Sequence, residues 1–180
     1  NAAIRGVVRC AVNNGLRVLG FEKGYNGLLE NEYREMDKRS VSDIVDRGGT
    51  ILFTARSKEF GEVEGKLKAI EILKKDGVDA LVVLGGDGTF KGAMDMSNLS
   101  EGTINVIGVP ATIDLDIACT EYTIGFDTAI NTAMEGVDRI RDTSTSHERC
   151  SIVEVMGRNA GYIAAYTGIS TGAEEIIIPE

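Results

Sequence analysis

Apolar, strand-like runs alternate with helix-like segments along almost the whole chain. The expected helices are residues 1–15, 64–77, 90–99, 127–144 and 159–171, with one further helical turn at 40–49. The expected strands are residues 16–21, 50–56, 78–86, 104–110, 150–157 and 174–180. Strands and helices that alternate through short loops predict an α/β fold: a doubly wound, Rossmann-like parallel sheet flanked by helices.

The pattern weakens over residues 141–150, so we expect one lobe at 1–144 and the start of a second, similar lobe at 145–180. No strand precedes the first helix, and nothing follows the last strand. Because helices in α/β folds normally follow a strand, we expect the chain to be a fragment of a longer protein, and a poor catalyst on its own.

The net charge of the 180-residue chain is −9, and no long basic run offsets it. This balance argues against a nucleic-acid or membrane-surface partner. The three cysteines, Cys10, Cys119 and Cys150, form no metal-binding pair, and no apolar run has the length of a membrane span. These features are typical of a reduced protein of the cytoplasm.

The apolar run at 78–84 ends in the sequence GGDGT, residues 85–89. Glycines at this point allow backbone N–H groups to approach phosphate oxygens, and Thr89 can cap the helix that follows. Asp87 is too negative to face phosphates alone, so a Mg²⁺ ion between them is the simplest interpretation. The alternative is a tight strand–helix turn in which Asp87 acts as a cap. The motif also occurs in NAD kinases and lipid kinases, so it indicates a phosphate site better than a substrate.

The segment TIDLD, residues 112–116, offers a second pair of acids. In an extended segment, Asp114 and Asp116 point to the same side. One can serve a metal ion while the other accepts a proton from a hydroxyl, and Thr112 can hold that hydroxyl or a phosphate. The alternative is a solvated loop with two capping carboxylates.

Two arginines, Arg56 and Arg158, follow apolar runs. Ligands of parallel α/β sheets sit at the carboxyl ends of the strands, where an arginine can neutralise a transferring phosphoryl group. The alternative for either arginine is a surface pair with a nearby acid.

The motifs NAAIRGVVR, SVSDIVDRGGT, GGDGT, TIDLD, YTIGFDTA, RDTSTSHER and VEVMGRNAGY resemble bacterial 6-phosphofructokinases, in order and spacing, over essentially the whole chain. The resemblance implies transfer of the γ-phosphoryl group of ATP to the 1-hydroxyl of fructose 6-phosphate, with Mg²⁺, in glycolysis. It also implies a cytoplasmic homotetramer regulated by ADP or phosphoenolpyruvate. In this interpretation residues 1–144 form the nucleotide-binding lobe and 145–180 begin the sugar-phosphate lobe.

The resemblance also implies roles for individual residues. Asp114 corresponds to the catalytic base, Asp87 and Asp116 to metal-linked acids, and Arg56 and Arg158 to the arginines around the transferring phosphate. The implied nucleotide contacts are Arg56, Gly86, Asp87, Gly88, Thr89 and Gly92. The implied sugar-phosphate contacts are Thr112, Asp114, Asp116, Met156, Gly157 and Arg158, with Arg149 reaching the site of a neighbouring subunit. The implied effector residues are Arg5, Arg9, Arg141, Gly172 and Glu174.

The chain departs from the family pattern at three positions. ATP-dependent members tend to have glycine both at the position of Gly88 and at that of Ala111, whereas pyrophosphate-dependent members have larger side chains there. Gly88 and the small Ala111 favour ATP. Leu115 replaces the usual asparagine, and strand alternation predicts that it points away from both acids. Cys119 replaces a glycine.

Two further functions remain open on the sequence alone. A non-catalytic nucleotide- or effector-binding module would fit the altered loop. Such modules lose the TID motif, both acids and the MGR motif, whereas this chain keeps all of them. A pyrophosphate-dependent phosphofructokinase is a variant of the first interpretation.

Overall fold

The computed structural model describes residues 1–179 and divides into two compact units. Unit 1 contains Asn1–Leu84 and Gly88–Val109, and unit 2 contains Gly85–Asp87 and the chain from Pro110 onward. Residues 110–144 join unit 2 because the long helix there packs against the last helix. The division therefore falls at different residues from the expected lobe boundary at 144, which stays a prediction.

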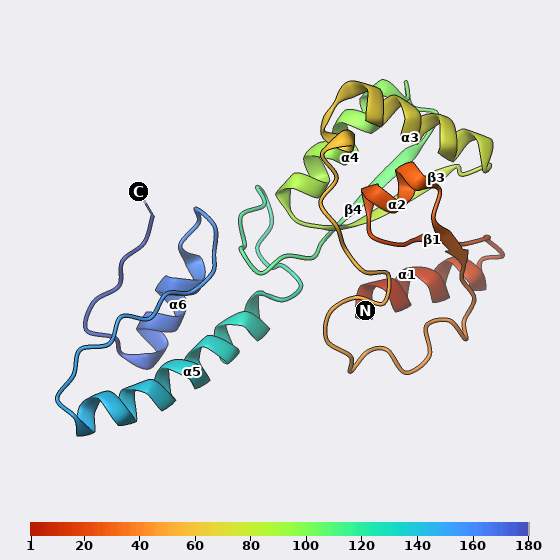
Figure 1. Cartoon of the computed structure of the whole chain (residues 1–180). Helices are drawn as coiled ribbons and strands as arrows, with labels where there is room; N and C mark the ends of the chain where they lie inside the picture. The colour runs from red at the N-terminus through yellow and green to blue at the C-terminus, as the bar shows by residue number, and fades with distance from the viewer. Residues whose placement is uncertain (180) are drawn as a thin grey trace. The chain divides into compact units, whose positions relative to one another are not determined.

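Figure 1 labels the helices α1–α6 and the strands β1, β3 and β4. In chain order the elements are α1 (Ala2–Asn13), β1 (Leu19–Phe21), α2 (Tyr25–Glu30), β2 (Tyr33–Glu35), η1 (Glu59–Gly61), α3 (Val63–Lys75), β3 (Ala80–Gly85), α4 (Asp87–Leu99), β4 (Asn105–Pro110), α5 (Phe126–Ser146) and α6 (Tyr162–Thr171). The five long helices and the two strands β3 and β4 lie where the sequence predicts them. Neither α2 nor β2 was expected.

Strands β3 and β4 form a parallel pair whose connection is helix α4. Backbone bonds from Asn105 N to Asp79 O and from Ala111 N to Gly85 O run in the same direction along both strands. This β3–α4–β4 unit confirms the expected α/β class, because parallel neighbours need a crossover of this kind. Strands β1 and β2 instead pair antiparallel, with Gly20 opposite Arg34.

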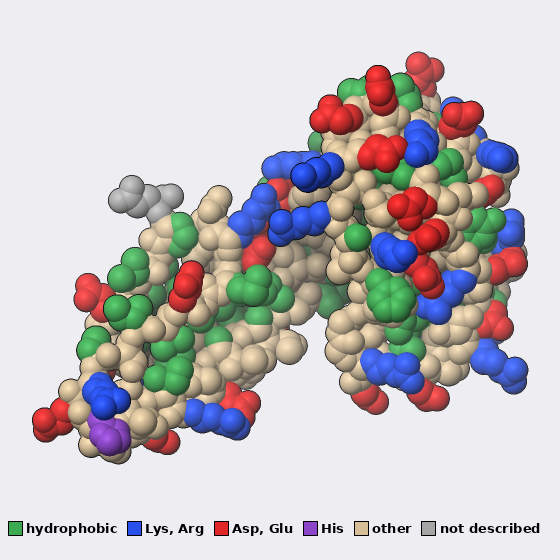
Figure 2. Space-filling model, in the orientation of Figure 1, with side chains coloured by type: hydrophobic (Ala, Val, Ile, Leu, Met, Phe, Trp, Pro, Cys, Tyr) green, Lys and Arg blue, Asp and Glu red, His purple; other side chains and the backbone are tan. Residues whose placement is uncertain are grey.

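Unit 1 is built on two apolar clusters. One joins α2, η1, α3 and α4 through Leu28, Phe60, Leu73 and Met96. The other packs the inner face of α1 against the chain that follows β2, through Ile4, Val8, Met36, Val41 and Ile44. Burial of these side chains is the main free-energy gain of the unit. Figure 2 shows acidic and basic side chains intermingled on its visible surface.

Unit 2 has a smaller core, in which α5 and α6 lie side by side (Figure 1). Its buried members are Phe126, Ile130 and Ile163, and the ring of Phe126 meets that of Tyr166 edge to face at 5.4 Å. Apolar side chains also remain on the surface of this unit, including Tyr166 and Ile169 of α6. In the part of the chain that the structure describes, no helix is long and apolar enough to cross a membrane.

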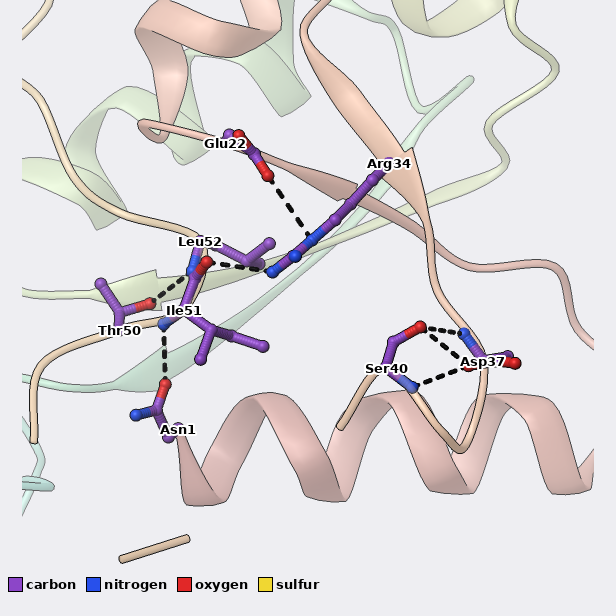
Figure 3. Close-up of polar contacts among 8 residues, drawn as sticks. All are labelled: Asn1, Glu22, Arg34, Asp37, Ser40, Thr50, Ile51 and Leu52. Atoms are coloured by element: carbon purple, nitrogen blue, oxygen red, sulfur yellow. Dashed lines mark hydrogen bonds and ion pairs between the residues drawn. The ribbon is translucent and has the colours of Figure 1, made fainter. Parts of the chain in front are cut away.

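The predicted strand at 50–56 is wrong: Phe53 N closes a turn onto Thr50 O, Leu52 O accepts from Lys23 N, and side chains bond other backbone groups of this turn. Ile51 N donates to Asn1 Oδ1 at 2.8 Å, Arg34 donates to Ile51 O at 3.0 Å, and Leu52 N donates to Thr50 Oγ1 (Figure 3). These partners replace a neighbouring strand. The segment 40–49, where a helical turn was expected, forms isolated turns instead, closed by bonds from Ser42 N to Arg39 O and from Arg47 N to Ile44 O. Ser40 Oγ accepts a bond from Asp37 N just before it (Figure 3).

The segments 150–157 and 174–179 are not strands either, although both are rich in isoleucine and valine. Their side chains are largely open: Ile152 is 92% exposed and Ile177 is 84% exposed. A strand is stabilised by cross-strand pairs and by burial of one face, and the described residues provide neither here. The last residue of the expected strand at 174–180, Glu180, lies outside the described residues.

Candidate active site

The end of β3 brings a glycine and an acid to the start of α4. A Cβ atom on Gly86 would lie 3.3 Å from Cβ of Thr112, so the glycine allows the segment at 112–116 to approach closely. Asp87, half-buried, is the first residue of α4. A carboxylate in the first turn of a helix interacts favourably with the helix dipole.

The loop after β4 carries the acids Asp114 and Asp116. Asp114 N donates to Thr112 Oγ1 at 3.2 Å, which fixes the start of this turn. Leu115, between the acids, has a φ of +55°, in the left-handed region. The expectation of an extended segment is therefore wrong: the chain turns at Leu115, and its side chain packs against the core of unit 2. The left-handed conformation costs an L-residue about 1–2 kcal/mol.

Arg158 joins these two segments. Its Nη1 lies 3.3 Å from Asp87 Oδ2 and 3.2 Å from Asp116 Oδ2. We call Asp87, Asp114, Asp116 and Arg158 the Arg158 cluster; all four belong to unit 2. The arginine side chain is 55% exposed, whereas those of Asp87 and Asp116 are 25% and 18% exposed. Ion pairs this open contribute little to stability, so a charged ligand can replace them at low cost.

The charges of the cluster act on Asp114. Burial raises the pKa of its carboxyl, the negative charge of Asp116 raises it further, and Arg158 opposes both effects. A carboxylate with a raised pKa is a stronger proton acceptor once it is ionised. The environment of Asp114 therefore suits a general base.

The carboxylates of Asp87 and Asp116 both contact Nη1 of Arg158, so they lie close enough together to be considered as ligands of the expected Mg²⁺. Among residues 1–179, no group of three or more acidic, histidine or cysteine side chains can hold a metal ion. Mg²⁺ is usually bound through one or two carboxylates together with waters and substrate phosphates. Asp87 and Asp116, which share Arg158 as a partner, fit such a site, whereas a cage made of protein ligands alone does not fit.

The other predicted nucleotide contacts belong to unit 1. Gly88, Thr89 and Gly92 lie in the first two turns of α4, and Arg56 is exposed in the loop before η1. A Cβ atom on Gly88 would meet nothing within 4 Å, whereas one on Gly92 would lie 2.8 Å from the ring of Phe60. The absence of a side chain at 92 is thus a packing requirement, while at 88 it leaves open space.

Tyr25 is a packing residue of unit 1. Its ring stacks on Phe60 at 3.7 Å, and its hydroxyl donates to Thr89 O at 2.7 Å. Burial raises the pKa of the phenol, so the hydroxyl keeps its proton. The tyrosine therefore holds the first turn of α4 through a residue of the GGDGT motif.

The predicted sugar-phosphate residues lie in two places in unit 2. Met156 is exposed and Gly157 is buried, directly before Arg158. Arg149 lies beyond the end of α5, where it lines a separate cavity of about 340 Å³ with Arg139 and Ser151. The role of Arg149 in the site of a neighbouring subunit stays a prediction.

The predicted effector residues are divided between the units. In unit 2, Arg141 donates to Gly172 O at 2.7 Å, and Glu174, two residues after Gly172, is exposed. In unit 1, Arg5 donates to Val41 O, while Arg9 is exposed on the same helix. An effector role for these five residues stays a prediction.

The comparisons with known proteins agree on one family. The model of the family described as phosphofructokinase matches residues 1–180. An ATP-dependent 6-phosphofructokinase of Clostridium botulinum is 60% identical over 180 residues, which are 100% of this chain and 56% of that protein. One of Clostridium tetani is 58% identical with the same coverage. The chain therefore spans about half the length of these curated relatives.

A solved structure supports the same assignment. The structure of phosphofructokinase from Saccharomyces cerevisiae matches with a TM-score of 0.90 and 36% sequence identity, over 96% of this chain and 26% of that one. The match supports the predicted α/β class for the chain, in agreement with its parallel β3–α4–β4 unit.

Proposed function

The chain belongs to the phosphofructokinase family, and we propose that its Arg158 cluster transfers the γ-phosphoryl group of ATP to the 1-hydroxyl of fructose 6-phosphate. The products are fructose 1,6-bisphosphate and ADP, as in glycolysis. The observation that carries this proposal is the convergence of Asp87, Asp116 and Arg158 from three separate segments. The name of the Clostridium botulinum relative supports ATP as the donor.

In the proposed reaction, Asp114 accepts the proton of the 1-hydroxyl while the hydroxyl oxygen forms a bond to the γ-phosphorus. The bond from that phosphorus to the bridging oxygen of ADP breaks. Arg158 exchanges its carboxylate partners for oxygens of the transferring group and stabilises their charge. Its exposure and its modest ion pairs make this exchange possible. Thr112, which accepts a bond from Asp114 N, keeps the base in place.

Asp87 and Asp116 would hold Mg²⁺, which when bound neutralises charge on the donor phosphates. Gly86, Gly88, Thr89 and Gly92 would place the phosphates at the start of α4, where backbone N–H groups favour anions. Met156 and Gly157 would line the sugar site, and Arg149 would reach the sugar phosphate in the site of a neighbouring subunit. We further propose a cytoplasmic homotetramer regulated by ADP or phosphoenolpyruvate, with Arg5, Arg9, Arg141, Gly172 and Glu174 at the effector site.

The test is steady-state turnover of fructose 6-phosphate by the purified protein with Mg²⁺, measured in parallel with ATP and with pyrophosphate, together with equilibrium binding of ATP. Turnover with ATP alone supports the proposal. Turnover with pyrophosphate alone would replace the donor. Saturable ATP binding without turnover would replace the kinase by a nucleotide-binding module.

Gly88 offers a prediction about donor choice. Because a Cβ atom there meets nothing within 4 Å, Gly88→Asp should fold normally. The new carboxylate would occupy space beside the donor phosphates and repel them. We expect the KM for ATP to rise by about tenfold or more, with an unchanged KM for fructose 6-phosphate.

A matched control is Gly136→Asp on α5, where a Cβ atom is also unobstructed. Both variants should melt close to the parent protein in a thermal scan. An unchanged KM for ATP in Gly88→Asp would place the donor away from the start of α4.

A further inference from the structure

The loop that carries Asp114 and Asp116 is closed at its base. Ile124 N donates to Pro110 O at 2.8 Å, and Ala111 N donates to Gly85 O at 2.9 Å. Residues 111–123 therefore leave the end of β4 and return to it. These two bonds lie at the base of the loop and do not fix the orientation of Asp114 and Asp116 within it.

Two residues of the loop have left-handed backbone conformations although neither is glycine. Leu115 has a φ of +55° and Cys119 has a φ of +57°. Such conformations are unfavourable for L-residues with a side chain, and leucine lacks the short polar group with which asparagine or aspartate tolerates them. They persist where the surrounding structure holds them.

The surroundings of the two residues differ. The side chain of Leu115 packs, with that of Ile113, against the cluster of Phe126, Ile130 and Ile163 between α5 and α6. Cys119 is exposed and belongs to no apolar cluster of the described residues. Only Leu115 thus has an apolar contact that offsets its backbone cost, and it lies directly between the two acids.

We propose that Leu115 is a positioning residue of this site: its side chain, anchored in the core of unit 2, holds the left-handed turn that orients Asp114 and Asp116. Asp116 then meets Arg158 at 3.2 Å, and Asp114 N meets Thr112 Oγ1 at 3.2 Å. The catalytic consequence rests on the proposed function, but the geometric claim does not.

The test uses four substitutions at one position. Leu115→Met keeps an apolar side chain of similar volume without a branch at Cβ. Leu115→Ile keeps the volume but adds a branch at Cβ, which is poorly compatible with a positive φ. Leu115→Ala removes the anchor, and Leu115→Asn removes the anchor while favouring the left-handed conformation.

The first readout is amide hydrogen exchange over residues 112–116 without substrates. We expect exchange to speed up by about tenfold in the Ala and Ile variants, because local opening follows the lost packing or the strained turn. It should stay within about twofold in the Met variant, which keeps the packing, and in the Asn variant, which favours the left-handed turn without an anchor. The second readout is steady-state kinetics. We expect kcat to fall by about tenfold in the Ala and Ile variants, with KM values nearly unchanged, and to stay near the parent value in the Met and Asn variants.

Cys119→Gly is the control, because it relieves a left-handed residue that has no anchor. It should raise the melting temperature slightly and leave both readouts unchanged. Parent-like exchange in the Ala and Ile variants would overturn the positioning role. A parent protein without turnover would refute the proposed function alone, since the exchange data still decide the role of Leu115.

Discussion

Replacement of Asp114 by asparagine is expected to lower kcat for fructose 6-phosphate by about 10²- to 10⁴-fold, the usual contribution of a general base. The amide keeps the size of the side chain but cannot accept the proton of the 1-hydroxyl. Because burial and the charge of Asp116 raise the pKa of Asp114, removal of its charge should not destabilise the fold. The KM values should change much less than kcat, and the measurement is steady-state kinetics with ATP and Mg²⁺.

Asp138→Asn is the matched control, since Asp138 is an exposed acid of α5 outside the Arg158 cluster. Its kinetics should equal those of the parent protein. A kcat in Asp114→Asn within a few-fold of the parent value would assign the base to another group.

Replacement of Arg158 by alanine is the second large expected effect. It removes the guanidinium that contacts both Asp87 and Asp116. We expect kcat to fall by about 10²- to 10³-fold, comparable to the loss of one donor that stabilises transition-state charge. Arg158→Lys should recover little of this, because one ammonium group does not reproduce the planar fork of donors.

The thermal stability of Arg158→Ala should barely change, since the arginine is 55% exposed and its pairs are of the surface kind. Arg139→Ala, which removes an exposed pair with Glu135 on α5, is the control for loss of a surface arginine. A large drop in melting temperature with a nearly normal kcat would make Arg158 a structural residue.

Much of the site could be predicted from motifs. Asp87, Asp114, Asp116 and Arg158 each lie in a segment whose residue types suit phosphate chemistry, and the resemblance to one family grouped them. The ion pairs from Arg158 to Asp87 and Asp116 depend on how distant segments fold together. No local pattern contains that information.

The backbone at Leu115 shows a different limit. Alternation assumes an extended chain, and it therefore predicted the wrong conformation for a residue with a φ of +55°. The propensity of leucine gives no signal of a left-handed turn, because the cost is offset by packing against residues of α5 and α6. Tertiary contacts decided the local structure here.

The strands show the same dependence on distant partners. The run at 80–85 pairs with β4 and is a strand, whereas the equally apolar segments at 150–157 and 174–179 have no ladder within the described chain. Composition identifies residues that suit a pleated surface, but a strand also needs a neighbour. Helices α1, α3, α4, α5 and α6 were predictable because their hydrogen bonds are internal.

The central claim is that this site transfers a phosphoryl group from ATP to fructose 6-phosphate. The most direct measurement is a single-turnover reaction of the purified protein with ATP labelled at the γ-phosphorus, fructose 6-phosphate and Mg²⁺. We predict that the label appears in fructose 1,6-bisphosphate and that Asp114→Asn slows this transfer by about 10²- to 10⁴-fold. Label that stays in ATP, or that appears only in inorganic phosphate, would contradict the claim.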